Sequence, residues 1–225
     1  MQDSAANLPP LAELAQRLYT AVLSDVLDEL GFMAQALRPF VRPLDEASVL
    51  CGFARTGLYR KVFHIEPGRN PYEIEMDLID GLKPGEVAVL ACDGPTDLVA
   101  PWGELLTTAA GVRGAAGCLT DGLVRDVRRI REMKFPVFAG GIGPLDTKGR
   151  AEMAAMDVPV EVARVRIESG DLIFGDVDGV VAVPKAVAPK AVARALEKVA
   201  AEDKTRDALL AGETLRRVFE RYGVL

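Results

Sequence analysis

The sequence predicts an α/β fold in a single domain. Segments with helical periodicity alternate with short apolar segments rich in β-branched residues, and glycine or proline separates the two kinds. The chain has 225 residues, of which 49% are hydrophobic and 27% charged, the composition of an ordinary globular protein. No internal repeat, low-complexity tract or linker divides the sequence. We therefore expect residues 1–225 to form one domain around a substantial core.

The N-terminal half predicts helices packed on a sheet. Apolar residues recur at three- and four-residue intervals through residues 11–30, which predicts one amphipathic helix that ends at Gly31. Strands and helices then alternate: a strand at 49–59, a helix at 72–82, a strand at 86–92, a helix at 103–112 and a strand at 115–120. The order strand, helix, strand indicates a sheet covered by helices.

The C-terminal half predicts shorter strands and a long closing helix. A short helix, a strand and a flexible connection are expected in turn at 126–133, 136–139 and 140–144. β-branched residues then indicate strands within 158–165 and around Leu172 and Val180. Residues from 189 to about 211 are dense in Ala, Lys, Arg and Glu, and predict a helix that Gly212 ends.

Charge and hydropathy argue against several functional classes. The net charge of −6 disfavours a nucleic-acid-binding face, because contacts to phosphates need clustered Lys and Arg. No apolar run approaches the roughly 18–20 residues of a membrane span, and the N-terminus lacks the pattern of a targeting peptide. The 3 cysteines are widely spaced and fit buried thiols of a reducing compartment. We expect a cytoplasmic protein that binds neither nucleic acid nor membrane.

The single histidine, His64, restricts the chemistry further. Multi-histidine metal centres are excluded, and a serine or cysteine nucleophile with a histidine base would need this residue. His64 lies between Phe63 and Ile65, where a packed or surface histidine is the commoner outcome. Its role, and that of Tyr72 nearby, stays open. Glycine-rich segments lack a nucleotide-binding fingerprint, which argues against a methyltransferase.

The strongest candidate site follows the predicted strand at 115–120. Arg125 and Asp126 are adjacent there, at the kind of strand end where α/β proteins commonly bind ligands. Asp126 offers the anionic oxygen that a hard divalent ion prefers, and Arg125 offers forked donors for a carboxylate or an enolate oxygen. The alternative is structural: Asp121 or Asp126 caps a helix and Arg125 is solvated.

A second candidate lies at the start of the predicted helix at 103–112. Gly103 precedes Glu104, Leu105 and Leu106, and backbone amides at a helix start can face an incoming anion. The alternative is a plain loop with an exposed glutamate. The residues alone leave both interpretations open.

Together, the two candidates resemble a family signature. Glu104 is followed after 20 residues by Arg125-Asp126, and an acid, 20 residues and Arg-Asp mark the class II 4-hydroxy-4-methyl-2-oxoglutarate/4-carboxy-4-hydroxy-2-oxoadipate aldolases and RraA, the regulator of RNase E activity. That family often has Asp at the position of Glu104. Further segments that resemble family landmarks lie at 24–31, 114–117, 121–126, 135–138 and 169–184. The resemblance spans roughly residues 20–212.

The resemblance implies a fold and an assembly. The fold is a β/β/α swivelling-type (RraA-like) α/β domain, and the assembly is a homotrimer or hexamer with active sites at subunit boundaries. A glutamate from the C-terminal helix of a neighbouring subunit would reach each site. Glu202 is the best match for this glutamate, and Glu197 is the alternative.

The resemblance also implies roles for the candidate residues. Asp126 would bind Mg²⁺ or Mn²⁺ directly, with Glu104 holding metal-bound water and Glu202 completing the metal site from the neighbouring subunit. Arg125 would contact the substrate. The carboxylate of a 2-oxo acid would lie against the helix start formed by Gly103, Glu104, Leu105 and Leu106.

The implied function is that of a metal-dependent lyase. Such an enzyme cleaves a 4-hydroxy-2-oxo acid to pyruvate through a metal-stabilised enolate, and the same chemistry would decarboxylate oxaloacetate as a side activity. The general base is not assigned, because the motif contains no histidine. The alternative from another class is a non-catalytic, RraA-like regulator that inhibits a ribonuclease by protein contact.

Overall fold

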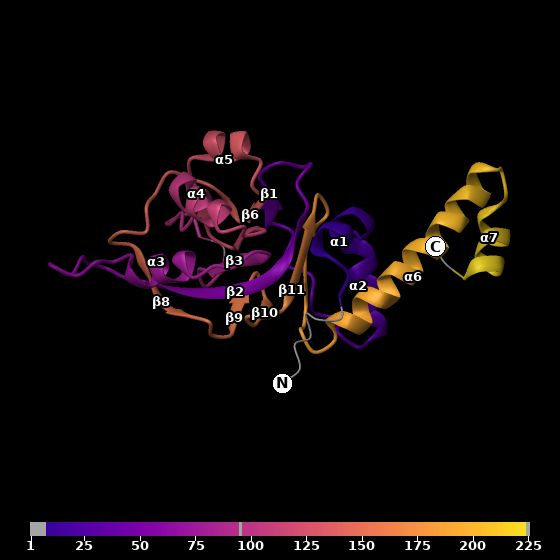
Figure 1. Cartoon of the computed structure of the whole chain (residues 1–225), viewed down its shortest axis with the longest axis horizontal. Coiled ribbons are helices and arrows are strands. Elements are labelled where there is room, and N and C mark those ends of the chain that lie inside the picture. Colours follow the sequence, from indigo (N-terminus) through magenta and orange to yellow (C-terminus); the bar gives the residue numbers. More distant parts are fainter. Residues whose placement is uncertain (1–7, 95, 224–225) are drawn as a thin grey trace.

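The computed structural model describes residues 8–94 and 96–223, and an eight-stranded sheet forms its centre (Figure 1). The strands of this sheet are β1 (Arg42–Pro43), β2 (Leu50–Lys61), β3 (Glu86–Ala91), β4 (Gly117–Thr120), β6 (Val137–Ala139), β8 (Ala151–Met156), β11 (Leu172–Asp176) and β12 (Gly179–Val183). Their order is β1-β6-β4-β3-β2-β11-β12, with β8 paired to the far end of β2. Neighbours among β2, β3, β4 and β6 run parallel, and the other pairs are antiparallel.

The two ends of this sheet approach each other, so the sheet is nearly closed. The backbone N–H of Leu37 donates to the carbonyl of Val180 at 2.9 Å. Arg42 Nη1 donates to the carbonyl of Asp178 at 2.7 Å and so joins β1 to the β11–β12 turn. Inside the curved sheet lie apolar side chains that include Leu50, Val87, Val89, Phe138 and Ile173. The predicted α/β class is confirmed.

Two groups of helices cover the outside of the sheet. The first group, α1 (Leu11–Arg17), α2 (Thr20–Glu29) and the start of α6 (Ala188–Leu210), packs on β11 and β12. The second group, α3 (Glu73–Asp80), α4 (Glu104–Val112) and α5 (Val127–Met133), packs on β3 and β4. Buried Leu78, Ala110 and Ile130 are the contacts of the second group. Within the described residues, no helix combines the length and the apolar character needed to cross a bilayer.

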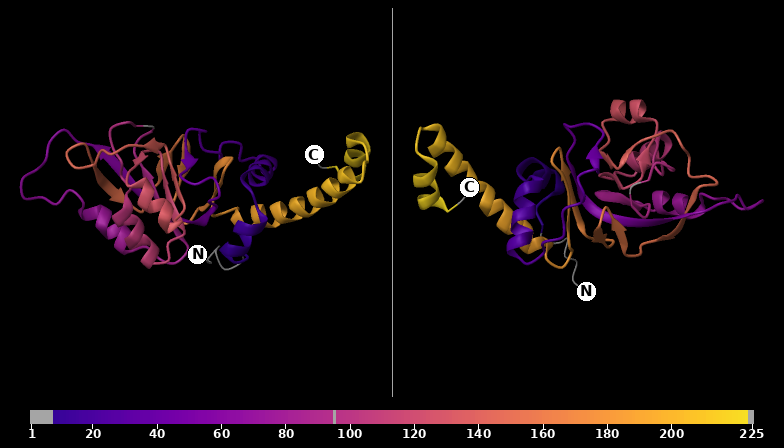
Figure 2. Two further views of the ribbon diagram at one scale, coloured as in Figure 1. Left: turned by 90° about the horizontal axis from the view of Figure 1, so that it is seen from above. Right: turned by 180° about the vertical axis from the view of Figure 1, so that it is seen from behind.

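Helix α6 projects away from the rest of the molecule (Figure 2). Its buried residues Ala188, Ala191, Val192 and Ala195 all lie in its first half, and of the later residues Thr205 alone is buried. The short α7 (Leu215–Tyr222) folds back against the distal half of α6. We call α6 and α7 together the C-terminal arm. The observed bounds of α6 differ by one residue from those predicted.

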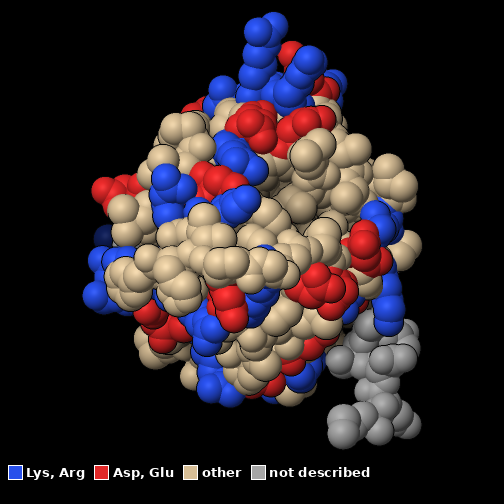
Figure 3. Space-filling model, turned by 90° about the vertical axis from the view of Figure 1, so that its left-hand side faces the viewer, with Lys and Arg blue, Asp and Glu red and all other residues tan. Residues whose placement is uncertain are grey.

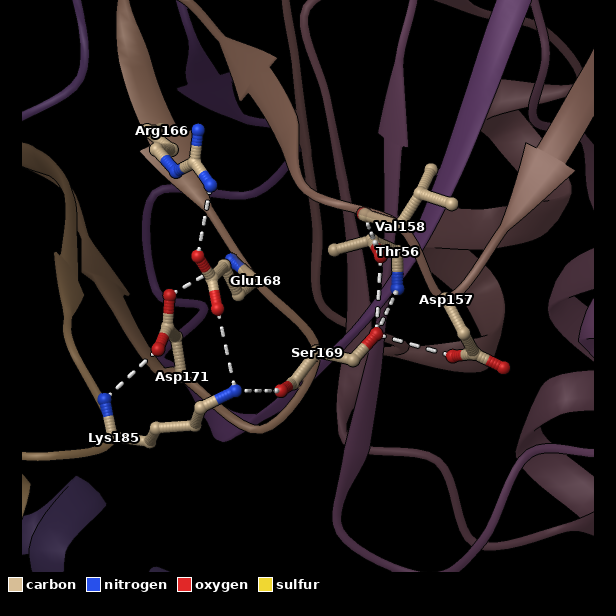
Figure 4. A network of polar contacts seen from close by, with 8 residues as sticks. All are labelled: Thr56, Asp157, Val158, Arg166, Glu168, Ser169, Asp171 and Lys185. Carbon is tan, nitrogen blue, oxygen red and sulfur yellow. Dashed lines mark hydrogen bonds and ion pairs between the residues drawn. The ribbon is translucent and has the colours of Figure 1, made fainter.

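A network of polar contacts fixes the start of the C-terminal arm (Figure 4). Buried Asp171 precedes β11, and its carboxylate accepts hydrogen bonds from the backbone N–H groups of Glu168 and Lys185, each at 2.8 Å. Lys185 leads directly into α6. The adjacent Ser169 hydroxyl lies 3.0 Å from the Thr56 hydroxyl on β2, so the sheet and the arm share one anchor.

The single helix predicted at 11–30 is wrong, because the chain is extended at Leu18 and Tyr19 and forms two helices. The cause is a tertiary contact. The carboxylate of Asp176, at the end of β11, accepts hydrogen bonds from the backbone N–H and the hydroxyl of Thr20, at 2.8 and 2.6 Å. This carboxylate satisfies the first donors of α2 and so favours a new helix start at Thr20.

Two further expectations also need correction. The flexible connection expected at 140–144 contains strand β7 (Gly141–Ile142), which pairs in parallel with β5 (Leu123–Val124). The strand expected within 158–165 is a hairpin of β9 (Val160–Val162) and β10 (Val165–Ile167).

Candidate active site

Two segments distant in the sequence lie side by side at the start of α4. An isolated parallel bridge pairs Trp102 with Val124, and the backbone N–H of Arg125 donates to the carbonyl of Trp102 at 3.0 Å. Trp102 is fully buried and stacks on Phe135, which holds this segment against the core. The bridge therefore brings Glu104 next to Arg125 and the following Asp126.

Asp126 connects the two segments through its side chain. Its Oδ2 accepts a hydrogen bond from the backbone N–H of Glu104 at 3.2 Å, and the side chain is 48% exposed. Asp126 has a φ of 58°, in the left-handed region that residues other than glycine rarely adopt. Such backbone strain persists where the surrounding structure demands it, and it is most frequent at functional sites. The carboxylate thus lies at the surface in a fixed place.

Gly103 makes room for these side chains. A Cβ on Gly103 would lie 2.7 Å from Asp126 Oδ2 and 3.2 Å from Arg125 Cγ. The backbone of Gly103 is extended, with a φ of −156°, so the need for glycine is steric and not conformational. The sequence indicated an open helix start at this glycine, and the structure adds that Arg125 and Asp126 pack directly over it.

The first turn of α4 faces a shallow hollow beside Asp126. The backbone N–H groups of Leu105 and Leu106 lie in this turn, where a helix supplies no acceptor of its own. The hollow is lined by Glu104, Leu105, Arg125, Asp126, Val127, Arg128 and Arg129. Figure 3 shows Lys and Arg side chains projecting at the top of the view, the side on which α5 lies. Basic side chains and helix amides together suit an anionic ligand.

A second set of residues lies on the other side of Arg125. Arg125 Nη2 is 3.6 Å from Asp146 Oδ1, and the Tyr72 hydroxyl donates to Asp146 Oδ2 at 2.5 Å. Nearby, the Tyr59 hydroxyl donates to the buried carboxyl group of Glu75. No sequence motif indicated Asp146, and the sequence left the roles of Tyr72 and Glu75 open, because only the fold brings α3 and the loop before β8 to Arg125.

Burial and neighbouring charges shift the pKa values of this second set. Burial, with the hydrogen bond to Asp146 as the second cause, raises the pKa of Tyr72 to about 12. Burial also raises the pKa of Glu75, and the charge of Asp146 acts in the same direction, while the hydrogen bond from Tyr59 and the charge of Arg125 oppose the rise. Tyr72 therefore stays a neutral hydrogen-bond donor at any working pH.

Other predicted residues lie apart from this site. His64 is exposed in the segment between β2 and α3. Asp121 is fully buried, where its carboxylate accepts hydrogen bonds from the backbone N–H groups of Cys92 and Gly94 at 2.7 and 2.9 Å. Burial raises the pKa of Asp121. The structural role considered for an aspartate of this motif thus applies to Asp121, which organises the loop after β3.

Glu202 lies in the distal half of α6, the half that projects away from α4 and α5 (Figure 1). This position is the one required if Glu202 acts in the site of another subunit. Glu197, the alternative, lines a groove between α2, α6 and α7 of its own chain. Both assignments stay predictions.

The carboxylates of one chain suit a metal ion that keeps part of its water. Among residues 8–94 and 96–223, no group of three or more His, Cys, Asp or Glu side chains is arranged to hold a metal ion. Mg²⁺, however, is commonly bound through one or two carboxylates, with water and ligand oxygens completing its octahedron. Asp126 and Glu104 offer such a pair at the rim of the hollow. These carboxylates therefore suit a hard divalent ion that keeps several water ligands, and not an ion coordinated by protein groups alone.

Comparison with known proteins decides the family. The family model described as "RraA-like: Aldolase/RraA" matches residues 20–182. The chain belongs to the RraA-like family. The resemblance inferred from the spacing of Glu104 and Arg125-Asp126 is thus confirmed.

Solved structures confirm the RraA-like fold. An uncharacterized protein from Pseudomonas syringae pv. tomato superposes with a TM-score of 0.81 at 30% sequence identity, covering 92% of this chain and 95% of that chain. Streptomyces coelicolor RraAS2, described as an unusual member of the RNase ES inhibitor RraA protein family, superposes with a TM-score of 0.75 at 28% identity, covering 88% and 98%.

Relatives at the sequence level carry several names. A protein named "Putative 4-hydroxy-4-methyl-2-oxoglutarate aldolase" from Halalkalibacterium halodurans is 30% identical over 189 residues, 84% of this chain and 82% of that protein. Protein DlpA of Legionella pneumophila is 29% identical over 216 residues, 96% of this chain and 34% of DlpA. An uncharacterized protein of Methanocaldococcus jannaschii is 38% identical over 119 residues, 53% of this chain and 57% of that protein. The RraA-like chain thus spans about a third of DlpA and little more than half of the archaeal protein.

Proposed function

We propose that the chain is a divalent-metal-dependent lyase that cleaves a 4-hydroxy-2-oxo acid to pyruvate. One observation carries this proposal: the bridge between Trp102 and Val124 places Glu104, Arg125 and Asp126 beside the first turn of α4. A half-buried carboxylate, an exposed carboxylate, an arginine and free helix amides are what a chelating 2-oxo acid and its metal ion require. The relative from Halalkalibacterium halodurans that bears an aldolase name supports the same reaction class.

Asp126 and Glu104 would hold Mg²⁺ or Mn²⁺ together with water. When bound, the ion would act as a Lewis acid toward the keto group of the substrate and favour the enolate left by C–C cleavage. We propose a homotrimer or hexamer in which Glu202 of a neighbouring subunit completes this acidic set. Oxaloacetate decarboxylation is the expected side activity, because it passes through the same pyruvate enolate.

The remaining groups would bind the substrate. The amides of Leu105 and Leu106 would receive the carboxylate of the 2-oxo acid at the positive end of α4. The guanidinium of Arg125 would bind the oxygen on which negative charge develops, an interaction that strengthens in the transition state. A water molecule held by a carboxylate would carry the proton.

The test is pyruvate release from oxaloacetate and from 4-hydroxy-4-methyl-2-oxoglutarate, with Mg²⁺ or Mn²⁺ and then with EDTA. We expect metal-dependent turnover that Asp126→Ala lowers by at least about a hundredfold. Asp157→Ala is the matched control, since Asp157 has the same left-handed backbone at a φ of 56° but lies outside the site. Equal activity of wild type and Asp126→Ala, or no turnover with either metal ion, would refute the proposal.

The second candidate is a non-catalytic regulator of a ribonuclease. The superposition on RraAS2, from a family described as RNase ES inhibitors, favours it. A regulator would slow RNA cleavage by a purified RNase E-type enzyme at stoichiometric concentration, with or without EDTA. Inhibition that persists in Asp126→Ala, combined with an absence of lyase turnover, would select this function.

A further inference from the structure

Arg125 lies between two carboxylates, and neither of them accepts a hydrogen bond from its guanidinium. Arg125 Nε is 3.9 Å from Asp126 Oδ2 on one side, and Arg125 Nη2 is 3.6 Å from Asp146 Oδ1 on the other. Both distances are those of ion pairs and exceed hydrogen-bond length. The two carboxylates therefore attract the guanidinium while its forked N–H groups stay available to a ligand.

Asp146 is itself held from several directions. Its Oδ2 accepts the Tyr72 hydroxyl at 2.5 Å, and its Oδ1 accepts the backbone N–H of Thr147 at 2.8 Å. Its carbonyl accepts Arg150 Nη1 at 3.1 Å. The carboxylate is two-thirds covered, with 32% of the side chain exposed. Asp146 is thus a fixed charge and not a mobile surface group.

Tyr72 links this charge to α3. Tyr72 is the residue that precedes α3, and its backbone N–H donates to the Asn70 side chain at 3.1 Å. The raised pKa of Tyr72 keeps its hydroxyl protonated, so it donates to Asp146 at every working pH. One turn further along α3, buried Glu75 lies near enough to Asp146 and Arg125 for their charges to shift its pKa.

We propose that Asp146, held by Tyr72, is a positioning residue that fixes the guanidinium of Arg125 for the substrate. The inference rests on the proposed lyase function for its kinetic consequence. An arginine loses side-chain entropy when its side chain is ordered, and a neighbouring fixed charge lowers that cost before the substrate binds. The segment from β2 to α3, which carries Tyr72, thereby acts on catalysis without touching the substrate.

A double-mutant cycle tests the kinetic consequence. Asp146→Asn keeps the shape and removes the charge, so we expect kcat to fall about tenfold with little change in KM. Tyr72→Phe should give a smaller fall of the same kind. In an Arg125→Lys background, which lacks the fork, Asp146→Asn should change kcat by less than about twofold. An equal fold loss in both backgrounds would mean that Asp146 acts through general structure, and would overturn the inference.

Two matched controls accompany the cycle. Asp157→Asn removes a comparable charge, which pairs with Arg55 at 3.4 Å outside the site, and should leave kcat unchanged. Tyr19→Phe removes a hydroxyl at the break between α1 and α2, far from Arg125 in the sequence and the fold, and should also be neutral.

Labelling of Arg125 by phenylglyoxal tests the pairing without any turnover. Asp146 Oδ1, 3.6 Å from Arg125 Nη2, hinders the approach of the reagent to the guanidinium nitrogens, and peptide mass spectrometry locates the label. We expect Asp146→Asn to raise the labelling rate of Arg125 several-fold and Asp157→Asn to leave it unchanged. A rate unaltered in Asp146→Asn would overturn the inference even if the lyase activity is real. A raised rate in a protein without lyase activity would retain the pairing and refute the proposed function alone.

Discussion

At Gly103, adding one methyl group would disturb the candidate site. The added carbon of Gly103→Ala would lie 2.7 Å from Asp126 Oδ2, so the carboxylate or the start of α4 must shift. A displacement approaching 1 Å at a catalytic group costs up to about a hundredfold in rate. We therefore expect kcat/KM for oxaloacetate to fall between about tenfold and a hundredfold, while the midpoint of urea unfolding changes little.

Gly111→Ala is the control for that variant within the same helix. A Cβ at Gly111 would meet only Phe135 Cδ2, at an ordinary contact distance of 3.9 Å. Gly111→Ala should leave activity unchanged and stabilise the protein by about 0.5–1 kcal/mol, the usual gain for this change inside a helix. A similar activity loss in both variants would mean that α4 itself, and not the contact with Asp126, limits catalysis.

The buried carboxyl group of Glu75 makes stability depend on pH. Its pKa is raised above the ordinary value of 4.5, with burial as the largest cause. The folded protein then binds more protons than the unfolded chain, so the contribution of Glu75 is complete below pH 4.5 and is lost as pH rises through the raised pKa. The groups that face it are Tyr59, Asp146 and Arg125.

Glu75→Gln removes this dependence and still accepts the hydrogen bond from Tyr59. We expect the variant to have a higher unfolding free energy than wild type at pH 8, and a difference near zero at pH 4. Urea denaturation at both pH values measures the effect. A constant difference across this range would contradict a raised pKa.

The sequence predicted some residues of this site but not Asp146, and the reason is physical. Glu104, Arg125 and Asp126 were found because their spacing is a family signature, and the bridge at Trp102 brings them together. Asp146 was missed because it contacts Tyr72 across a separation of 74 residues. No local pattern encodes such a contact, since it depends on where β8 joins the sheet.

At the scale of elements, the sequence predicted the strands of the parallel core and most helices, and failed where tertiary contacts or unusual turns decide. Apolar periodicity continues from α1 to α2, but Asp176 at the end of β11 caps Thr20 and a second helix starts there. The β9–β10 turn has Ala163 and Arg164 at φ values of 49° and 73°. These residues lack the Asn-Gly signature of such turns, so the hairpin looked like one strand.

Strand β8 was missed because its composition favours the wrong element. Ala151–Met156 reads Ala-Glu-Met-Ala-Ala-Met, which has high helix propensity. Pairing with the far end of β2 overrides this propensity. Backbone pairing with β2 therefore outweighs the low strand propensity of the β8 residues.

The anchor at Asp171 offers a test at this scale. Asp171→Ala removes a buried acceptor and leaves the backbone N–H groups of Glu168 and Lys185 without it. Loss of two hydrogen bonds to a charged acceptor should lower the unfolding free energy by about 2–4 kcal/mol, measured by urea denaturation. Asp178→Ala, an exposed aspartate in the neighbouring turn, should cost less than about 0.5 kcal/mol. Equal losses in the two variants would show that Asp171 is not an anchor.

At the scale of the whole molecule, the C-terminal arm is difficult to explain in a single chain. A helix of 23 residues is about 35 Å long, and its distal half contacts α7 more than the sheet. A helix extended away from its own core loses the burial that normally stabilises it. We infer that the arm packs against a second copy of the chain, consistent with the assembly proposed above.

Complementation between two inactive variants tests this arrangement. In the proposed arrangement, Asp126→Ala would remove a metal ligand from one side of each site, and Glu202→Ala would remove the group supplied by the neighbour. Each variant alone should lose most of its activity. After subunits exchange at an equal ratio in a closed ring, about a quarter of the sites should combine wild-type Asp126 with wild-type Glu202, and about a quarter of the wild-type activity should return. Glu197→Ala in place of Glu202→Ala tests the alternative residue in the same way. If both glutamates act within their own chain, mixing the two variants restores no activity. That result would contradict a site shared between subunits, even if each variant alone is inactive.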